Sequence, residues 1–484
     1  MSELDITSLL PMLILAVGIM FTMLLVAVKR NHILTFFCTL IVLLASFISI
    51  LFIKVEAPHA IGELFLIDRF GLYFQALILL ATLAITIFSY ISILNFFPEK
   101  RKEEYYLLLM LATLGSATMV ISTHFISFFV SLEVLNVSLY TLISYYRERT
   151  TAIEAGLKYL ILAAMSSAFL LFGMALIYAI TGTMSFHPLA SIITTLNTTD
   201  TIMMLIGIGL MIVGIGFKLG LVPFHMWTPD VYEGASSPIS SFIATVSKGA
   251  MVAVLLRFFI MANLYRFEKI IMVFTGIAIL SMLIGNLLAL LQNNIKRIFA
   301  YSSIAHFGYV LVALISGKEL GPPAAIFYIT AYTITILGAF GLITIISKSD
   351  DETTDINSYQ GLFWRHPVLA AIFTVVLLSL AGIPLTAGFM GKYFLLTAGV
   401  GQGKWLLAIT LVISSVIGLY YYLRLINMMM KQNDDATSNS NLSKILSISG
   451  GLVLAILGFL VIWLGVSPNW LIDLVNRLLT SLTS

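Results

Sequence analysis

The sequence is poor in charge, and this shortage excludes a whole class of protein. Only 10% of its 484 residues are charged, whereas an ordinary soluble domain carries about a quarter. With 60% hydrophobic residues and a mean hydropathy of +1.04, the chain could not cover its surface with polar groups. A water-soluble globule is therefore excluded, and we expect most of the surface to face lipid.

Residues that hold cofactors, metals or nucleic acid are also missing. A single cysteine, Cys38, cannot ligate an iron–sulfur cluster, build a structural zinc site or close an internal disulfide. The sequence contains no GxGxxG that opens a helix, no GxxxxGK[ST] and no cluster of metal ligands. The net charge of +3 is scattered, which excludes a nucleic-acid partner. We therefore expect no cofactor and no metal in this chain.

Long apolar runs are abundant, and each is a candidate membrane span. A spanning helix needs about 20 mostly apolar residues. The sequence predicts an all-α, polytopic membrane protein of about fourteen such helices: 7–28, 33–53, 72–96, 105–122, 125–146, 158–180, 201–224, 238–261, 270–291, 298–316, 323–347, 368–399, 405–430 and 446–466. The last segment, from Trp470 to Thr483, is amphipathic and is expected at the membrane interface. Because the connecting loops are short, the work of the protein is expected inside the bilayer.

The basic residues of the loops predict the orientation in the membrane, since cytoplasmic loops carry an excess of lysine and arginine. Thirteen lie in odd-numbered loops: Lys29, Arg30, Lys100, Arg101, Lys102, Arg147, Arg149, Lys296, Arg297, Lys348, Arg365, Lys431 and Lys444. Six lie in even-numbered loops: Lys54, Arg69, Arg266, Lys269, Lys318 and Lys404. The odd loops should be cytoplasmic, which places both termini in the periplasm. An even number of helices agrees with this, because it puts the two termini on the same side.

Three lysines fall near the middle of predicted spans. Lys218, Lys248 and Lys392 would each cost about 2.5–3.5 kcal/mol if they faced lipid, so we expect them to face the protein interior or water. Glu133 is the clear intramembrane acid, about nine residues into its helix. A lysine beside a carboxylate keeps its proton, and one separated from it tends to lose its proton when buried. Such residues could therefore pass protons across the membrane.

Other polar residues in or beside the predicted spans each allow two interpretations, one structural and one functional. Lys158 and Glu154 have the spacing of a simple i,i+4 salt bridge, and they could equally join a proton path. His225 and His306 are either hydrogen-bonded core residues or relays between the lysines, and Glu133 is either a structural ion-pair partner or a proton carrier. Arg257 and Arg424 lie toward helix ends, where we expect their side chains to reach the interface as anchors.

Two of the predicted spans, the seventh and the twelfth, contain helix breakers. Pro223 lies five residues after Lys218, and Gly382, Pro384 and Gly388 precede Lys392. Matching breaks in two halves of a membrane protein indicate inverted repeats. We therefore expect two inverted five-helix repeats, helices four to eight and nine to thirteen, in the following division: an N-terminal three-helix segment (1–104), a first repeat (105–261), a second repeat (262–430), and a last helix with an interfacial tail (431–484).

Three segments resemble a known family. They read GFKLGLVPFHMWTPDVYEGASSPIS, NIKRIFAYSSIAHFGY and LSLAGIPLTAGFMGKY. They are similar to the antiporter-like proton-translocating membrane subunits that respiratory complex I shares with multi-subunit cation/proton antiporters. The resemblance extends over about residues 100–430.

The resemblance implies a role for each intramembrane charge. Glu133 and Lys218 would be the paired residues of a first half-channel, Lys248 the central connector, and Lys392 the lysine of a second half-channel. His225 and His306 would lie on the connecting path, with Lys158 and Glu154 at a secondary position. Protons would enter from the cytoplasm through the first half and leave on the opposite face through the second.

The resemblance also implies the setting. The chain would be a membrane-arm subunit of NADH:quinone oxidoreductase in a bacterial inner membrane, beside other membrane-arm subunits, especially antiporter-like homologues. FMN, iron–sulfur clusters, NADH and quinone would belong to partner subunits. The alternative is a subunit of a multi-subunit sodium/proton antiporter. A scaffold that only holds its neighbours is disfavoured, because it gains nothing from three central lysines.

Overall fold

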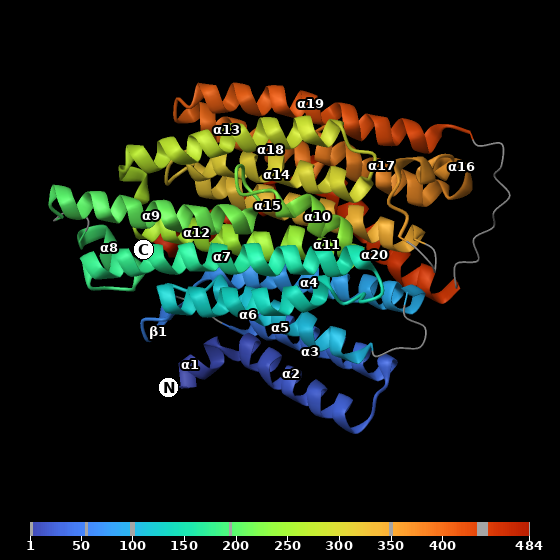
Figure 1. Cartoon of the computed structure of the whole chain (residues 1–484), viewed down its shortest axis with the longest axis horizontal. Coiled ribbons are helices and arrows are strands. Elements are labelled where there is room, and N and C mark those ends of the chain that lie inside the picture. Colours follow the sequence, from blue (N-terminus) through green and yellow to red (C-terminus); the bar gives the residue numbers. More distant parts are fainter. Residues whose placement is uncertain are drawn as a thin grey trace.

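The chain forms an elongated bundle of helices that lie roughly along one direction (Figure 1). The computed structural model describes residues 3–53, 57–96, 102–192, 196–347, 352–432 and 444–483. Within them, twelve helices are long and apolar enough to cross a membrane: α2 (Leu10–Val28), α3 (His32–Phe52), α4 (Arg69–Phe96), α6 (Phe125–Ile143), α7 (Thr150–Thr181), α9 (Thr198–Leu219), Ser237–Met261, α13 (Glu268–Leu290), α14 (Ile295–Leu314), α15 (Gly321–Ile346), α19 (Trp405–Met430), and Ser449–Val466 of α20 (Lys444–Val466). The prediction of an all-α membrane protein is confirmed.

Two of the fourteen expected spans are not single long helices. The run 105–122 forms α5 (Glu103–Met119), which has only 17 residues. The run 368–399 is divided into α17 (Pro367–Ala381) and α18 (Ala387–Gly401). The expected count of fourteen is therefore not reproduced by single spanning helices in the described part of the chain.

The remaining elements are short. They are α1 (Glu3–Ser8), β1 (His59–Ile61), β2 (Phe65–Ile67), α8 (Phe186–Ile192), α10 (Trp227–Gly234), α11 (Ser237–Phe242), the π-helix η2 (Ile243–Ser247), α12 (Lys248–Met261), the 3-10 helices η3 (Leu264–Arg266) and η4 (Ile356–Tyr359), α16 (Leu362–Arg365) and α21 (Asn469–Thr483). The antiparallel hairpin of β1 and β2 was not expected, because strands of three residues are too short to show an alternating pattern. The predicted C-terminal amphipathic segment is α21, which packs on α4, α12 and α15.

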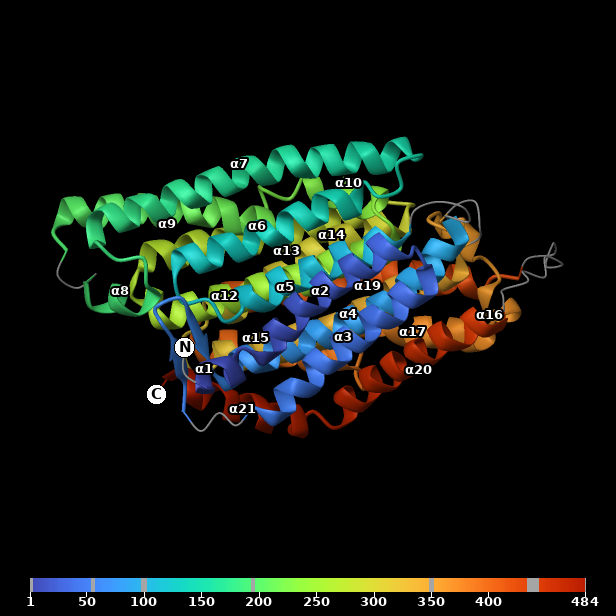
Figure 2. The ribbon, with the colours of Figure 1, turned by 90° about the horizontal axis from the view of Figure 1, so that it is seen from below.

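Both termini lie at the same end of the bundle (Figures 1 and 2). We call this the terminal end, which carries α1, β1 and α21; the α16 end is the opposite one. An even number of crossings requires this arrangement. Of the loop cations used to predict the orientation, Lys54, Lys100, Arg101 and Lys348 lie outside the described residues, and the side chain of Lys444 is not described either.

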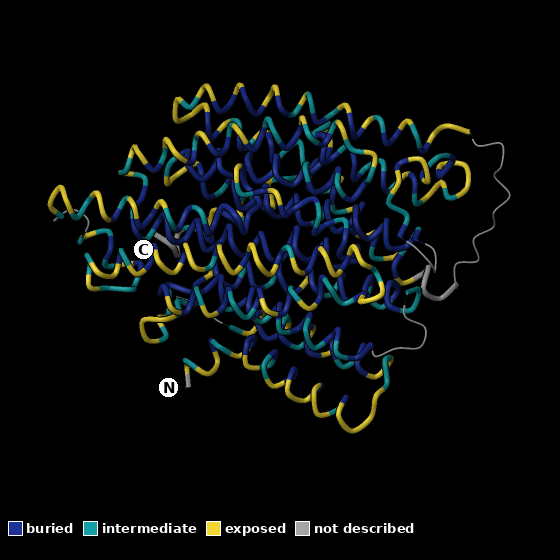
Figure 3. The backbone as a smooth tube through the Cα atoms, in the orientation of Figure 1, coloured by how far each residue is buried: buried dark blue, intermediate teal, exposed yellow. Residues whose placement is uncertain are grey.

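The central helices are more buried than those at the margins (Figure 3). In α2 only 33% of the most apolar window is buried inside the protein, and in α7 only 39%. By contrast, Ser237–Met261 is 100% buried, and α14 and α15 are each 89% buried. Side chains on the central helices therefore contact protein, whereas the exposed apolar residues of α2, α3 and α7 form a surface that suits lipid.

Both predicted helix breaks are present, and each helix ends at a glycine that precedes the proline. α9 ends at Leu219, and Gly220 follows with φ of 70°. α17 ends at Ala381, and Gly382 follows with φ of 85°. Because glycine adopts positive φ without steric cost, it terminates a helix readily. The break in the seventh span therefore begins three residues before Pro223.

One predicted break residue has a different place. Pro384 lies in the non-helical segment between α17 and α18, as expected, but Gly388 is the second residue of α18. Its amide donates to Ser379 Oγ at 3.0 Å, and a Cβ at this position would overlap the carbonyl oxygen of Ser379. Gly388 therefore permits the close approach of α18 to the end of α17 and does not itself interrupt a helix.

Two helix pairs, α6 with α7 and α14 with α15, have the same backbone pattern at their outer ends, at an offset of 170 residues. We call them the first and the second hairpin. His124 and Asn294 are the N-caps of α6 and α14, and they form isolated β-bridges with Ser185 and Asp355. The amides that follow each cap donate in the same way, Phe125 to Met184 and Ile295 to Thr354. The first hairpin lies near α8 at the terminal end, and the second lies near η4 and α16 at the opposite end (Figure 1).

Candidate functional site: a line of buried lysines

Lys218 lies in the last turn of α9, next to the break, and its ammonium group has neutral partners. Nζ donates to Asn136 Oδ1 at 2.6 Å and to the Tyr159 hydroxyl at 2.8 Å. Asn136 in turn donates to Glu133 Oε1 at 3.1 Å, because the two side chains are three residues apart on one face of α6. Glu133 and Lys218 are thus linked through Asn136, not by direct contact.

The non-helical segment after α9 lies close to α10 and to Lys248. The indole of Trp227, at the start of α10, donates to the carbonyl of Phe217, which also accepts from the amide of Gly220 at the end of α9. A Cβ on Gly220 would lie 2.6 Å from Thr228 Oγ1 and 3.1 Å from Lys248 Nζ. Glycine is therefore required both for the positive φ and for the space beside Lys248.

Lys248 is fully buried at the start of α12, directly after the π-helix η2. Its Nζ donates to Ser303 Oγ at 2.9 Å, and it lies 4.8 Å from the ring centre of Phe307. The rings of Trp227 and Tyr232 complete its surroundings at 5.8 Å and 5.5 Å. Aromatic faces stabilise an ammonium group without taking its proton.

Lys392 lies on α18, where it contacts the end of the interrupted helix α17. Its Nζ donates to the carbonyls of Leu380 and Ala381 at 3.0 and 2.9 Å, and to Ser415 Oγ at 2.8 Å. The last carbonyls of a helix have no partner within it and carry a partial negative charge. The break thus supplies acceptors that stabilise a buried ammonium group without a carboxylate.

One face of α14 lies between Lys248 and Lys392. It carries Ser303, which contacts Lys248; His306; and Tyr309, whose ring centre is 5.3 Å from Lys392 Nζ. His306 contacts the hydroxyls of Tyr328 and Tyr422 at 2.6 and 3.3 Å. The predicted site residues Lys248, His306 and Lys392 are therefore brought together around one helix.

Several hydroxyl and amide groups of this line were not predicted from the sequence. They are Asn136, Tyr159, Ser303, Tyr309, Tyr328 and Tyr422. A single tyrosine, serine or asparagine is common in membrane helices, so no signal in one sequence distinguishes these residues. His225 was predicted and lies in the segment between α9 and α10, but its buried Nδ1 has no partner among the described residues.

The secondary pair Lys158 and Glu154 forms the expected i,i+4 salt bridge, at 2.6 Å. The pair belongs to a larger network, because Lys158 also contacts Asp230 at 2.7 Å and Asp230 contacts Arg297 at 3.0 Å. Burial alone would raise the pKa of the Asp230 carboxyl. The hydrogen bonds and charges of Lys158 and Arg297 outweigh that effect and hold this pKa below its usual value.

The Asp230 network should contribute little stability, and its contribution should not depend on pH near neutrality. A carboxyl group whose pKa is lowered by folding stabilises the folded state at any pH above its pKa in the unfolded chain, about 3.9. This stabilisation is lost only as the pH falls through the lower pKa of the folded state. We expect Asp230→Asn to lower the free energy of unfolding by about 1 kcal/mol or less, equally at pH 6 and pH 8. Thermal unfolding of the purified assembly measures this, with the exposed Asp473→Asn as control; a decrement that differed between the two pH values would contradict it.

Two basic residues occupy different places from those predicted. Arg257 is fully buried and forms a two-pronged ion pair with Asp68, at 2.9 and 2.8 Å, so the prediction of an interfacial anchor was wrong. Lys296, counted as a loop cation, is buried and pairs with Glu352. Arg424 contacts the loop residues Gln292 and Asn293, which is compatible with an anchor.

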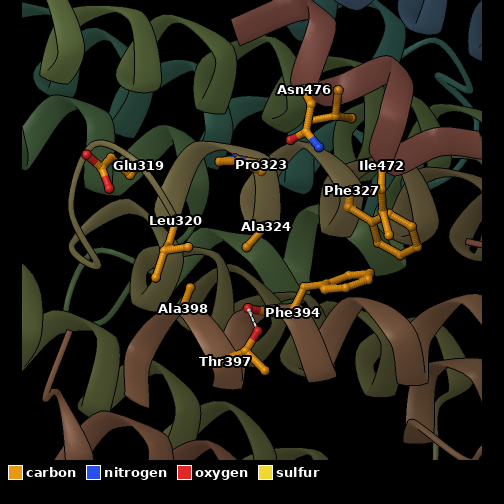
Figure 4. A pocket seen from close by; sticks show the side chains of 11 residues that line it. Glu319, Leu320, Pro323, Ala324, Phe327, Phe394, Thr397, Ala398, Ile472 and Asn476 are labelled. Atoms are coloured by element: carbon orange, nitrogen blue, oxygen red, sulfur yellow. Dashed lines mark hydrogen bonds between the residues drawn. The ribbon is translucent and has the colours of Figure 1, made fainter. Parts of the chain in front are cut away.

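A mostly apolar pocket of about 400 Å³ lies apart from the lysines (Figure 4). It is lined by the start of α15, by α18 and by α21, with Glu319 and Asn476 as its polar margin. None of the three lysines lines it. Within the described residues there is also no group of three histidine, cysteine, aspartate or glutamate side chains that could hold a metal ion.

The amino-acid sequence of the chain matches a known protein family. Residues 122–418 match a family described as NADH:quinone oxidoreductase/Mrp antiporter, TM. The chain is 42% identical over 476 residues to NADH-quinone oxidoreductase subunit N of Ectopseudomonas mendocina (strain ymp), covering 97% of this chain and 96% of the relative. The motifs and Lys392, where subunit M typically has glutamate, predict subunit N of the bacterial proton-translocating enzyme within the family. This prediction is confirmed.

Solved structures share the fold over almost the whole chain. A chain of respiratory complex I from Thermus thermophilus with bound aureothin is 30% identical, with a TM-score of 0.81 and coverage of 96% of this chain and 98% of that one. The Mrp complex from Dietzia sp. DQ12-45-1b is 21% identical with a TM-score of 0.85, and covers 99% and 98%, respectively. The latter likeness shows the fold alone. The chain belongs to the NADH:quinone oxidoreductase/Mrp antiporter family of membrane subunits.

Proposed function

We propose that this chain is a membrane-arm subunit of NADH:quinone oxidoreductase that translocates protons across a bacterial inner membrane. Its proton transfer is coupled to electron transfer from NADH to quinone in partner subunits. Glu133, Lys218, Lys248 and Lys392 carry the protons, and His225, His306, Lys158 and Glu154 serve secondary parts of the path. The 42% identity to subunit N of such an enzyme, over 97% of the chain, favours this function over that of a sodium/proton antiporter.

One observation carries the proposal: the three central lysines differ in their partners from the two other cations that are completely buried, Arg257 and Lys296. Arg257 and Lys296 are each paired with a carboxylate. Lys218, Lys248 and Lys392 are held by hydroxyl, amide and carbonyl groups and by aromatic rings. A buried ammonium group without a carboxylate partner releases its proton at lower cost than one in an ion pair. Such lysines suit a relay, whereas the ion pairs suit structure.

The path has three steps along the chain. Glu133 reaches Lys218 through Asn136, so a change in this contact alters how strongly the carboxylate holds the lysine in its protonated form. Tyr159 and Trp227, whose ring centres are 4.9 Å apart, lie between Lys218 and Lys248. Ser303, His306 and Tyr309 on α14 then lead from Lys248 to Lys392. The titrations of such a line are coupled, so its pKa values belong to the whole line.

The two hairpins related by 170 residues support a division into inverted repeats, 105–261 and 262–430, between an N-terminal segment 1–104 and a C-terminal segment 431–484. Glu133 and Asn136 of α6 correspond by this offset to Ser303 and His306 of α14. The first repeat would therefore contribute the Lys218 half of the path and the second repeat the Lys392 half, with Lys248 between them.

The proposed setting rests on the similarity to NADH-quinone oxidoreductase subunit N. FMN, iron–sulfur clusters, NADH and quinone belong to partner subunits, and this chain contacts other membrane-arm subunits and the bilayer. Both termini would face the periplasm. The shared end of the two termini and the excess of lysine and arginine in the loops of the α16 end support this orientation.

Replacing Lys218 with alanine tests the proposed function. Because the ammonium group that Asn136 and Tyr159 hold is removed, we expect fewer protons to be translocated per electron in the reconstituted complex. NADH oxidation and proton uptake into the same vesicles measure the ratio. The exposed Lys269→Ala is the matched control, and its ratio should equal that of the unmodified complex. An unchanged ratio for Lys218→Ala would remove Lys218 from the path.

A further inference from the structure

Two helix ends meet where the broken helix continues, at the junction of α10 and α11. α10 ends at Gly234, and the long helix that contains Lys248 begins at Ser237. Lys296 Nζ, from the first turn of α14, donates to the carbonyls of Glu233 and Ala235 at 3.0 and 2.5 Å. A cation therefore lies against the last carbonyls of α10, where the partial charge of the helix is negative.

The other helix end has the opposite charge beside it. The carboxylate of Glu352 accepts from the amide of Ser237 at 2.8 Å through Oε1 and pairs with Lys296 Nζ at 2.5 Å through Oε2. The first amides of a helix lack partners and favour an anion. The side chain of Lys296 is fully buried and that of Glu352 is 4% exposed, so this ion pair spans the junction within the protein interior.

We propose that Lys296 and Glu352 are a positioning pair that clamps the α10–α11 junction and thereby holds Lys248 against Ser303. The inference rests on the proposed function, because it assigns the pair a role in proton transfer through Lys248. Neither residue touches the three central lysines through a hydrogen bond in the described structure. Both act through the helices whose ends they hold.

The connection from the clamp to Lys248 is continuous. The helix that begins at Ser237 reaches Lys248 after three turns and includes the π-helix η2, a backbone form that is rarer and less regular than the α-helix. α10, whose last carbonyls accept from Lys296, carries Tyr232. The ring of Tyr232 lies 5.5 Å from Lys248 Nζ. Lys296 lies in the first turn of α14, which carries Ser303 two turns later. The clamp thus fixes both partners of the Lys248–Ser303 contact relative to each other.

The hairpin does not need this pair for its own backbone geometry. By the offset of 170 residues, Lys296 and Glu352 correspond to Ile126 and Gly182 of the first hairpin, which has the corresponding bridge and, in His124, a corresponding N-cap. Ile126 is 51% exposed and Gly182 is a helix C-cap with φ of 68°. Both hairpins pack against α10, the first through α7 and the second through α14, but in the described residues only the second carries an ion pair at these positions.

The test uses the complete complex with Glu352→Gln and the conservative Glu352→Asp in this chain. For Glu352→Gln, we expect hydrogen–deuterium exchange of the peptide amides in 237–247 to be about tenfold faster or more, because the junction loses its anion. We expect the protons per electron to fall as well, while NADH oxidation and the flavin content continue to report an assembled complex. Glu352→Asp should restore most of both, and Arg30→Gln, at an exposed ion pair, should change neither.

A double exchange of the charges separates clamping from simple attraction. Lys296→Glu combined with Glu352→Lys keeps an ion pair but places each charge beside a helix end of its own sign, so we expect it not to restore slow exchange. Restoration by the exchange would overturn the helix-end argument, and unchanged amide exchange in Glu352→Gln would overturn the clamp. Faster exchange with a normal proton ratio would overturn the role in proton transfer. An unchanged proton ratio in Lys218→Ala would instead contradict the proposed function. It would leave the clamp standing, because the amide exchange of 237–247 does not depend on proton transfer through Lys218.

Discussion

Replacing Lys248 with methionine should interrupt proton transfer between the two halves of the chain. Methionine has a similar length and fills the fully buried site, but it cannot bind a proton or donate to Ser303. A relay group of this kind contributes on the order of 10²–10⁴-fold to the rate of proton transfer, so we expect transfer through this chain to become negligible. The measurement is the number of protons translocated per electron by the reconstituted complex, with assembly followed by NADH oxidation.

Combining this change with Lys218→Ala tests whether the lysines lie on one path. Residues that act in series lose the same function once, so the double variant should translocate as many protons as either single variant. The exposed Lys269→Met serves as the control for substitution of a lysine by methionine. A double variant with a further loss, equal to the sum of the single losses, would mean that Lys218 and Lys248 serve parallel paths.

The cost of charge in lipid was enough to predict where the three lysines lie. Lys218, Lys248 and Lys392 have exposed fractions of 3%, 0% and 7%, as the argument from burial requires. The breakers beside Lys218 and Lys392 likewise predicted the two interruptions. These predictions depend on composition and on residues close together in sequence, which a single chain displays directly.

Contacts between distant segments could not be predicted in the same way. Arg257 lies toward the end of its helix, a position that predicts an interfacial anchor, but its partner Asp68 is 189 residues away in sequence. Lys296 follows a polar loop segment and is therefore predicted to be a loop cation, although Glu352, 56 residues later, pairs with it inside the protein. Apolar periodicity gives no information about which helices become neighbours, so neither ion pair has a signal in the sequence.

Replacing Asp68 with asparagine should destabilise the chain strongly. The guanidinium group of Arg257 donates to both carboxylate oxygens of Asp68, and both side chains are 0% exposed. Removal of one partner leaves an uncompensated buried charge, which costs about 3–5 kcal/mol. We expect a lower midpoint of thermal unfolding and less of the chain in the assembled complex, measured by its recovery from membranes.

A second substitution separates the cost of an unpaired charge from a need for the ion pair itself. Two buried partners can often be replaced together by apolar residues at little cost, since no charge then remains without a partner. Asp68→Asn combined with Arg257→Met should therefore recover a large part of the stability that Asp68→Asn loses. Asp68 also accepts from the amide of Gly71 at 2.7 Å, a contact that the asparagine side chain can keep. If the double variant were as unstable as the single one, the pair would have to fix the packing of α4 against α12, because the charge of Arg257 alone could not explain the loss.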